Sequence, residues 1–220
     1  MDEYKARDFS VTPRRGDYEM TALLLYLLFQ QPQVVRDPME IKMKQKLIEM
    51  IKEKALLLGD FTLASGRKSN YYLDLRRLTL QSESASLLGK MLFEMLEKTD
   101  YDAIGGPAMG AIPIIGAVLD HAGSKGKSLK GFFIRKEAKD HGTGKLIEGP
   151  VEEGDRVVIV EDTTTTAGAL IRACDTAIKA GLTIVKVIVV IDRLEGASEN
   201  MKKAGYEYEA LVTTIDLGLK

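Results

Sequence analysis

The stretch VVIVEDTTTTAGAL, residues 157–170, joins an apolar run to two acidic residues, four threonines and a series of small residues. Helical periodicity begins at about Gly168, and a second apolar run follows over residues 183–191. Continuous Val and Ile runs are typical of strands covered on both faces, and a helix between two such strands indicates a right-handed crossover in a parallel sheet. The stretch therefore predicts an α/β fold, doubly wound, with a mostly parallel sheet flanked by helices.

The pattern on either side of this unit predicts further helices, strands and a hairpin. The expected elements are a helix over residues 39–58, a hairpin around Ser65 and Gly66, a helix over 85–96, a strand over 101–104, a helix over 112–121, strands over 132–134 and 156–160, and a helix over 168–180. Residues 1–38, which contain three prolines, are expected to form an N-terminal extension of unknown role. Residues 39–220 are expected to form one domain.

Composition and charge argue against several classes of protein. Thirty-one Lys and Arg residues against 32 Asp and Glu residues leave a formal net charge of −1, which indicates neither a nucleic-acid nor a membrane surface. The single cysteine, Cys174, cannot form an internal disulfide, and two histidines provide no metal-ligand spacing. The most apolar stretch, residues 22–29, is shorter than the roughly 20 residues of a membrane span. We therefore expect a cytoplasmic protein without a nucleic-acid or membrane partner.

Glu161 and Asp162 stand where the apolar run ends, at the edge of the sheet where open α/β folds bind their ligands. The loop over residues 163–169 leads into the amino end of a helix, whose free N–H groups and dipole suit a phosphate. The adjacent carboxylates would repel that phosphate unless they faced donors such as the vicinal hydroxyls of a ribose. These features predict a ribose 5-phosphate pocket. In the alternative interpretation, the threonines merely continue the strand and the acidic residues cap the helix.

A second group of candidate residues lies in RKEAKDHGTGK, residues 135–145. It gathers positive or protonatable side chains on a segment that contains two glycines. Alone, such a run is typical of a solvated loop. Beside a ribose phosphate pocket, it predicts a lid that neutralises a departing pyrophosphate. GGPAMG, residues 105–110, is a second small-residue loop suited to backbone contacts with the same pyrophosphate.

These motifs carry a family resemblance. The acidic pair and the small-residue loop after VVIV resemble the signature of type I phosphoribosyltransferases. FTLASGRKSNYYLDLR, GPAMGAIP, RKEAKDHGTGKLIEG and the later IDR together resemble orotate phosphoribosyltransferases over roughly residues 40–195. The resemblance implies the type I phosphoribosyltransferase fold with a small N-terminal hood-like region, and a phosphoribosyltransferase domain over residues 39–220.

The resemblance also implies an activity. Members transfer ribose 5-phosphate from phosphoribosyl pyrophosphate to orotate, which gives orotidine 5′-monophosphate and pyrophosphate in pyrimidine (UMP) biosynthesis. The Mg²⁺ cofactor is carried by the pyrophosphate, with no direct protein ligand expected. The resemblance further implies a homodimer in which part of the lid loop reaches the neighbouring subunit's site.

The matching positions imply a role for each residue of the site. Five residues would be catalytic. Glu161 and Asp162 would hold the ribose hydroxyls and stabilise the charge at the anomeric carbon. The pyrophosphate would be bound by Lys136, Lys139 and His141 together with Arg135. The 5′-phosphate would be held by Thr163, Thr164, Thr165, Thr166, Ala167, Gly168 and Ala169. Orotate would contact Thr165 and Arg193, with Tyr72 and Leu73 flanking its ring. Whether a lid residue acts as a general acid stays open.

Three positions depart from the family pattern. Ala64 and Gly110 stand where some members have a lysine, and Ala167 replaces a frequent glycine, a mild change unless the backbone there needs a positive φ. Two other functions stay open beside the orotate-specific enzyme. One is a phosphoribosyltransferase for another base, and the other is a non-catalytic regulator that senses phosphoribosyl pyrophosphate.

Overall fold

Alternate side chains of the strand β6 (Arg156–Thr164) belong to two different hydrophobic cores, one on each face of the central sheet. Val157 packs with residues of the helix α6 (Gly168–Lys179), whereas Val158 packs in the core on the opposite face. Both side chains are fully buried. This double burial explains why the strand is a continuous apolar run rather than an alternating one.

The computed structural model of the chain describes residues 37–62, 68–137 and 145–219. In spatial order, the strands of the central sheet are β5 (Ile147–Glu148), β4 (Lys130–Ile134), β3 (Ala103–Pro107), β6, β7 (Thr183–Asp192) and β8 (Tyr208–Thr213). All neighbouring strands are parallel except β4 and β5, which are antiparallel. The prediction of a mostly parallel sheet is therefore confirmed.

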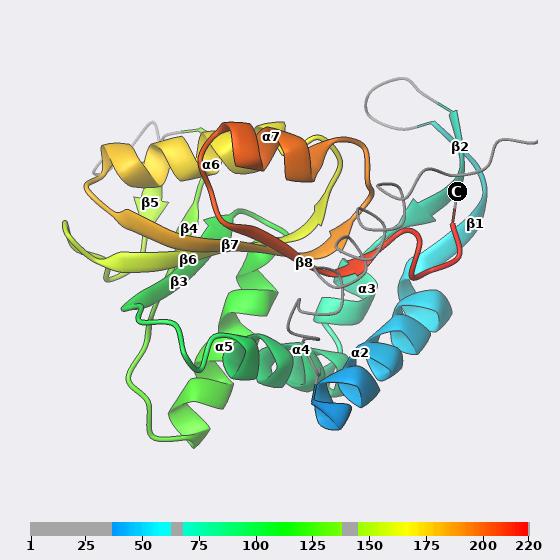
Figure 1. Cartoon of the computed structure of the whole chain (residues 1–220), viewed down its shortest axis with the longest axis horizontal. Helices are drawn as coiled ribbons and strands as arrows, with labels where there is room; N and C mark the ends of the chain where they lie inside the picture. The colour runs from blue at the N-terminus through cyan, green and yellow to red at the C-terminus, as the bar shows by residue number, and fades with distance from the viewer. Residues whose placement is uncertain (1–36, 63–67, 138–144, 220) are drawn as a thin grey trace, which may run out of the picture. The chain divides into compact units, whose positions relative to one another are not determined.

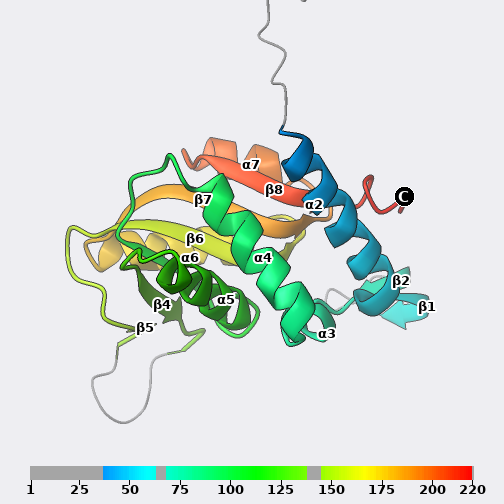
Figure 2. The same ribbon diagram turned by 90° about the horizontal axis from the view of Figure 1, so that it is seen from below.

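Helices cover both faces of this sheet. The helices are α2 (Pro38–Met50), α3 (Arg76–Thr79), α4 (Ser82–Met95), α5 (Ala111–Ser124), α6 and α7 (Ala197–Lys203). Figure 1 shows α6 and α7 above the sheet and α4 and α5 below it, and the view from below in Figure 2 shows α2 beside α4 on that same lower side. The helices α3 and α7 and the strands β5 and β8 were not among the predicted elements.

A two-stranded hairpin lies outside the central sheet. Its strands, β1 (Leu56–Thr62) and β2 (Lys68–Leu73), pair antiparallel. The predicted turn at Ser65 and Gly66 lies outside the described residues. The predicted helix over residues 39–58 is wrong at its end, because α2 is followed by a π-helical turn (Ile51–Ala55) and Leu56 already pairs with Leu73. An apolar run such as ALLL fits a helix or a strand, and the pairing with β2 selects the strand.

Two strands extend beyond their predicted limits. β6 was expected to end at Val160, but its pairing with β7 continues to Thr164. The strand predicted over residues 101–104 is β3, which runs on to Pro107, so that only residues 108–110 of the expected small-residue loop form a loop. Glycine makes this close packing possible, because a Cβ on Gly106 would lie 2.0 Å from the carbonyl oxygen of Val160.

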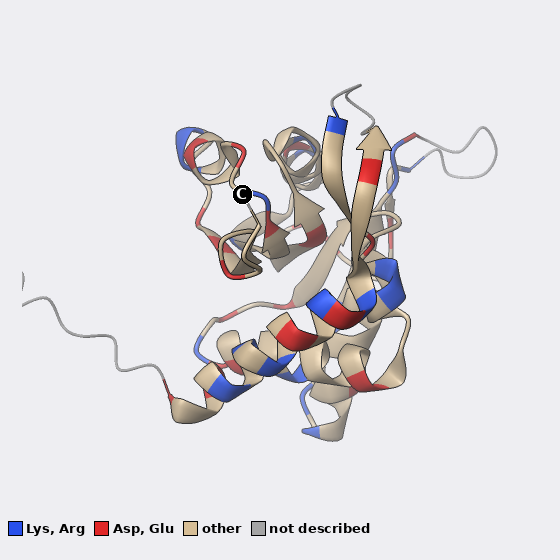
Figure 3. Ribbon diagram, turned by 90° about the vertical axis from the view of Figure 1, so that its right-hand side faces the viewer, with Lys and Arg blue, Asp and Glu red and all other residues tan. Residues whose placement is uncertain are grey.

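Charged residues of both signs occur along α2 (Figure 3). Two of its lysines make ion pairs with residues far along the chain. Lys44 Nζ lies 3.1 Å from an Asp216 carboxylate oxygen, and Lys46 Nζ lies 3.0 Å from a Glu83 carboxylate oxygen. These pairs are partly exposed and contribute at most about 1 kcal/mol each, so the buried residues of α2, led by Leu47, supply most of its attachment.

Candidate active site

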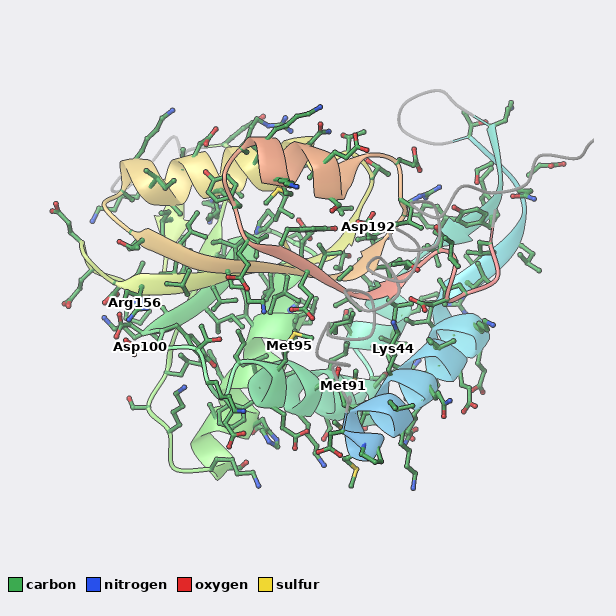
Figure 4. The ribbon with its side chains drawn as sticks, viewed as in Figure 1. Lys44, Met91, Met95, Asp100, Arg156 and Asp192 are labelled. Carbon is green, nitrogen blue, oxygen red and sulfur yellow. The ribbon has the colours of Figure 1, made fainter. Side chains whose placement is uncertain are left out.

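The carboxyl ends of β3 and β6 open into a pocket of about 1020 Å³, which the hairpin residues of β2 help to enclose. Figure 4 shows Asp192, the last residue of β7, at one end of the sheet and Arg156 and Asp100, which form an ion pair, at the other. The pocket thus lies at the edge of the sheet where parallel α/β folds bind ligands.

The structure brings eight of the sequence-predicted site residues together on the wall of this pocket. From the central sheet and its loops come Asp162, Thr163, Thr165 and Arg193. From the hairpin and the loop after β4 come Tyr72, Leu73, Arg135 and Lys136. Glu161, Thr164, Thr166, Ala167, Gly168 and Ala169 belong to the same strand and loop but not to this wall. Lys139 and His141 lie outside the described residues.

The acidic pair occupies the part of β6 that extends past β3. β3 pairs with β6 only as far as Ile159, so Glu161 and Asp162 have a strand neighbour on the β7 side alone. The Asp162 N–H donates to Glu161 Oε1 at 3.0 Å, and the Thr163 N–H donates to Asp162 Oδ1 at 2.6 Å. The strand therefore continues through the acids to Thr164, as the alternative interpretation expected for the first threonines. The acids do not cap the helix, because the N-cap residue of α6 is Ala167.

Burial changes the protonation of this pair. Burial first, and the neighbouring Asp162 carboxylate second, raise the pKa of Glu161 to about 9. Burial also raises the pKa of Asp162, although hydrogen bonds from Glu161 and from the Thr163 N–H oppose that shift. Glu161 is therefore protonated in the ligand-free protein near neutral pH, and Asp162 is the member of the pair that faces the pocket.

The loop at the amino end of α6 has an unusual backbone conformation. Ala167 has φ 63° and ψ 10°, in the left-handed region, so this position does need the positive φ that glycine would adopt freely. An alanine there costs about 1–2 kcal/mol. The N–H groups of Gly168 and Ala169 open the helix and have no carbonyl partner within it, so they are suited to bind an anion.

One hydroxyl of the threonine run is buried and unsatisfied. Thr163 Oγ1 has no hydrogen-bond partner among the described residues, and Thr163 lies on the pocket wall. A buried hydroxyl without a partner is costly in a folded protein. A polar ligand in the pocket could satisfy it.

Arg193 is held in place by residues from two parts of the chain. Its guanidinium carbon lies 4.9 Å from the ring centroid of Tyr71, and Nη2 donates to the Tyr71 hydroxyl at 3.3 Å. Nε pairs with Glu195 Oε1 at 3.1 Å. The preceding Asp192 is 2% exposed and accepts from the Tyr208 hydroxyl at 2.9 Å and from the Leu194 N–H at 2.7 Å. The arginine is thus positioned before any ligand binds.

The loop after β4 begins and ends on a fixed stem. The Arg135 N–H donates to the Leu146 carbonyl at 2.9 Å, and Arg135 Nη1 lies 3.3 Å from Glu148 Oε1. Lys136 follows on the pocket wall of its own chain. Positive charge therefore lines the same pocket as Asp162.

Two functional candidates were missed at the level of sequence. Tyr71 contacts Arg193 although only its neighbours Tyr72 and Leu73 were singled out. Arg76, which pairs with Asp74 at 2.8 Å, is a further cation on the pocket wall. Both lie in FTLASGRKSNYYLDLR. The folded hairpin brings Tyr71 against Arg193, and Arg76 of α3 lines the pocket.

Residues 37–62, 68–137 and 145–219 contain no group of three or more His, Cys, Asp and Glu side chains that could hold a metal ion. None of the helices there has the length and apolar character needed to cross a bilayer.

Comparisons with known proteins agree with this geometry. The phosphoribosyl transferase domain family matches residues 77–209. Orotate phosphoribosyltransferase of Tropheryma whipplei (strain Twist) is 46% identical over 175 residues, which cover 79% of this chain and 82% of that protein. The crystal structure of Mycobacterium tuberculosis H37Rv orotate phosphoribosyltransferase in complex with Fe(III) dicitrate matches with a TM-score of 0.72 and 37% identity, covering 80% of this chain and 99% of that chain.

A second structure of the mycobacterial enzyme, in complex with 5-phospho-alpha-D-ribosyl 1-diphosphate, matches with a TM-score of 0.69 and 34% identity and covers 80% of this chain and 99% of that chain. The family match covers more than half of the chain, and the identity to the relatives extends over most of it. The type I phosphoribosyltransferase fold expected from the sequence is therefore confirmed. The chain belongs to the phosphoribosyltransferase family, among its orotate phosphoribosyltransferases.

Proposed function

We propose that this chain transfers ribose 5-phosphate from phosphoribosyl pyrophosphate to N1 of orotate. The bond between the anomeric carbon and the pyrophosphate oxygen breaks, a bond from N1 to that carbon forms, and the N1 proton is released. The products are orotidine 5′-monophosphate and pyrophosphate. The observation that carries the proposal is the meeting of Asp162, Lys136 and the fixed Arg193 around one pocket.

Recognition of the base rests on Arg193. A guanidinium fork suits the carboxylate of orotate, and the 3.3 Å and 3.1 Å contacts with Tyr71 and Glu195 reduce the entropy lost when the base binds. Tyr72 and Leu73 flank the flat ring, and Thr165 supplies a hydroxyl. A base without a carboxylate would leave Arg193 without its ligand, which favours orotate over the other pyrimidines and the purines.

Catalysis rests on charge stabilisation rather than on a protein nucleophile. Departure of pyrophosphate leaves positive charge on the sugar, and Asp162 is close enough to the pocket to stabilise it. Glu161, which holds a proton in the ligand-free protein, and Asp162 together accept hydrogen bonds from the two ribose hydroxyls. The loop over residues 163–169 binds the 5′-phosphate and fixes the sugar relative to the base.

Pyrophosphate is bound by the cations of the lid loop. Arg135 and Lys136 act from the stem, and Lys139 and His141 act from the segment outside the described residues. Mg²⁺ would be carried by the pyrophosphate as part of the substrate and would neutralise charge on the leaving group. A homodimer that shares its lid loops and a cytoplasmic location accompany this proposal as predictions.

The test is consumption of orotate, followed by its ultraviolet absorbance, with phosphoribosyl pyrophosphate and Mg²⁺. We expect Lys136→Ala and Asp162→Asn each to lower kcat by roughly 100- to 1000-fold, by analogy with loss of a transition-state donor. Lys125→Ala, an exposed lysine beyond the far end of α5, is the matched control and should keep the wild-type rate.

If the wild-type protein binds phosphoribosyl pyrophosphate but leaves orotate unchanged, the orotate assignment is wrong, and uracil and the purines are tested next. Mixing Lys136→Ala with Asp162→Asn tests the shared lid. Because random pairing makes half of the dimers mixed, with one intact site each, recovery of about a quarter of the wild-type rate means that Lys136 serves the neighbouring site. No recovery means that Lys136 acts in its own pocket.

A further inference from the structure

The peptide between Thr166 and Ala167 is held by hydrogen bonds at both ends. The Thr166 carbonyl oxygen accepts from Asn200 Nδ2 at 2.9 Å, and the Ala167 N–H donates to Thr164 Oγ1 at 3.1 Å. The two partners come from different elements, because Asn200 belongs to α7 and Thr164 ends β6. The orientation of this peptide plane is therefore fixed from both sides.

Helix α7 is a firm support for Asn200. The neighbouring Met201 is fully buried, and Ala197 is 1% exposed. Both belong to the hydrophobic core that also contains Ala167, in the loop over residues 163–169, and Leu170 of α6. The backbone of Asn200 is bonded within the helix, from its N–H to the Gly196 carbonyl at 3.1 Å. A shared core thus sets the distance between the amide of Asn200 and the loop.

The loop needs such support because its backbone is strained. The positive φ of Ala167 is unfavourable for a residue other than glycine, so the adjoining peptide would tend to rotate if it were not held, and that rotation would carry the Thr166 carbonyl away from Asn200. A carbonyl oxygen near a phosphate is repulsive, whereas the N–H groups of the loop attract it. The bond from Asn200 keeps the carbonyl directed at α7 instead.

We propose that Asn200 is a positioning residue for the 5′-phosphate, which acts by holding the Thr166 carbonyl away from the phosphate site. The inference rests on the proposed function, since it presumes that the loop over residues 163–169 binds the phosphate of the substrate and product. Asn200 does not contact the reacting atoms. Its loss weakens phosphate binding selectively and leaves recognition of the base unchanged.

The test compares two ligands that differ only by the phosphate, orotidine 5′-monophosphate and orotidine, in calorimetric titrations of the full chain. The dissociation constant of orotidine divided by that of orotidine 5′-monophosphate measures the contribution of the phosphate to binding. We expect Asn200→Ala to lower this ratio by about 10-fold, equivalent to one hydrogen bond, with the dissociation constant of orotidine unchanged. Asn200→Asp keeps the shape of the side chain but replaces the donor by an acceptor, so it should lower the ratio at least as much.

Ser198→Ala provides the matched control, because Ser198 is exposed on the first turn of the same helix. It should leave the ratio as in the wild type. Thr164→Val removes the bond at the other end of the peptide and should lower the ratio as well. In steady-state kinetics, the KM for phosphoribosyl pyrophosphate should rise in Asn200→Ala while the KM for orotate stays constant. Thermal unfolding of each variant shows that it is folded.

Failure of the inference differs from failure of the proposed function. If wild-type protein binds orotidine as tightly as orotidine 5′-monophosphate, the phosphate site itself is wrong. If wild type prefers the monophosphate and both Asn200 variants keep the full preference, Asn200 has no positioning role. An equal loss of affinity for both ligands would mean that Asn200 only supports the fold, and it would overturn the inference too.

Discussion

Gly110→Ala should slow the reaction by displacing Asp162 rather than by unfolding the chain. A Cβ built on Gly110 would lie 2.6 Å from Asp162 Cγ and 2.7 and 2.8 Å from its two carboxylate oxygens. Gly110 has φ −62° and ψ −39°, which alanine adopts without strain. The atoms nearest to the new methyl group are those of the Asp162 carboxylate on the pocket wall, so this carboxylate must shift, against its hydrogen bond from the Thr163 N–H at 2.6 Å.

The size of the effect follows from these distances. Non-bonded carbon atoms pack at about 3.5–4.0 Å, so Asp162 must move by about 1 Å. A displacement of that size at a catalytic group costs on the order of 100-fold in rate. Because Asp162 acts on charge that develops in the transition state, we expect kcat and kcat/KM to fall together, with little change in the KM for phosphoribosyl pyrophosphate.

The assay is the absorbance change of orotate, measured together with thermal unfolding. Gly116→Ala is the matched control, since it makes the same change within α5, the helix that Gly110 precedes, at a position where a Cβ meets nothing within 4 Å. It should keep the wild-type rate and gain roughly 0.5–1 kcal/mol of stability. In an Asp162→Asn background, Gly110→Ala should cost little more. If Gly110→Ala keeps the wild-type kcat, the position of Asp162 does not limit catalysis, and the reasoning is refuted.

Two further predictions concern the base and the acidic pair. Tyr71→Phe keeps the ring against Arg193 but removes the 3.3 Å hydrogen bond. The KM for orotate should therefore rise roughly 3- to 10-fold, while kcat and the KM for phosphoribosyl pyrophosphate stay unchanged. An unchanged KM for orotate would mean that Tyr71 has no role in base recognition. Glu161, whose pKa is raised from 4.5 to about 9, holds a proton in the folded protein that the unfolded chain releases, so its contribution to stability is complete below pH 4.5 and is lost as the pH rises toward about 9. Urea unfolding between about pH 6 and pH 8 should show a decline in the free energy of unfolding for the ligand-free wild type that Glu161→Gln reduces, and equal slopes would contradict the shift.

The sequence predicted the central part of the fold because its two signals, the continuous apolar runs and the helical periodicity between them, are local. Val157 and Val158 are buried on opposite faces of the sheet, and a run of such residues indicates a parallel strand without knowledge of its partners. The limits of the strands depend on those partners. β6 continues to Thr164 because β7 runs beside it, and Leu56 lies in a strand because Leu73 pairs with it. Neither pairing is visible from a window of neighbouring residues.

The candidate site divides in the same way. Asp162, Lys136 and Arg193 were found because each belongs to a recognisable motif, and the pocket contains all three. Tyr71 and Asn200 were missed for a physical reason. Tyr71 meets Arg193 across 122 positions of sequence, and Asn200 meets Thr166 across 34. Such positioning contacts leave no local pattern, since a tyrosine or an asparagine also occurs on solvated surfaces without any positioning role.

The acidic pair lies just beyond the last residue of β6 that pairs with β3. β3 stops pairing at Ile159, so beyond that residue β6 has a paired neighbour only on the β7 side. Successive side chains of a strand point to opposite faces, and the two acids differ accordingly: burial raises the pKa of Glu161 to about 9, whereas Asp162 lines the pocket. A β3 that continued in register would bury both acids without a ligand, at a cost of several kcal/mol for each charge. The small residues after β3, above all Gly110, leave room for the Asp162 carboxylate where the chain turns away from β6.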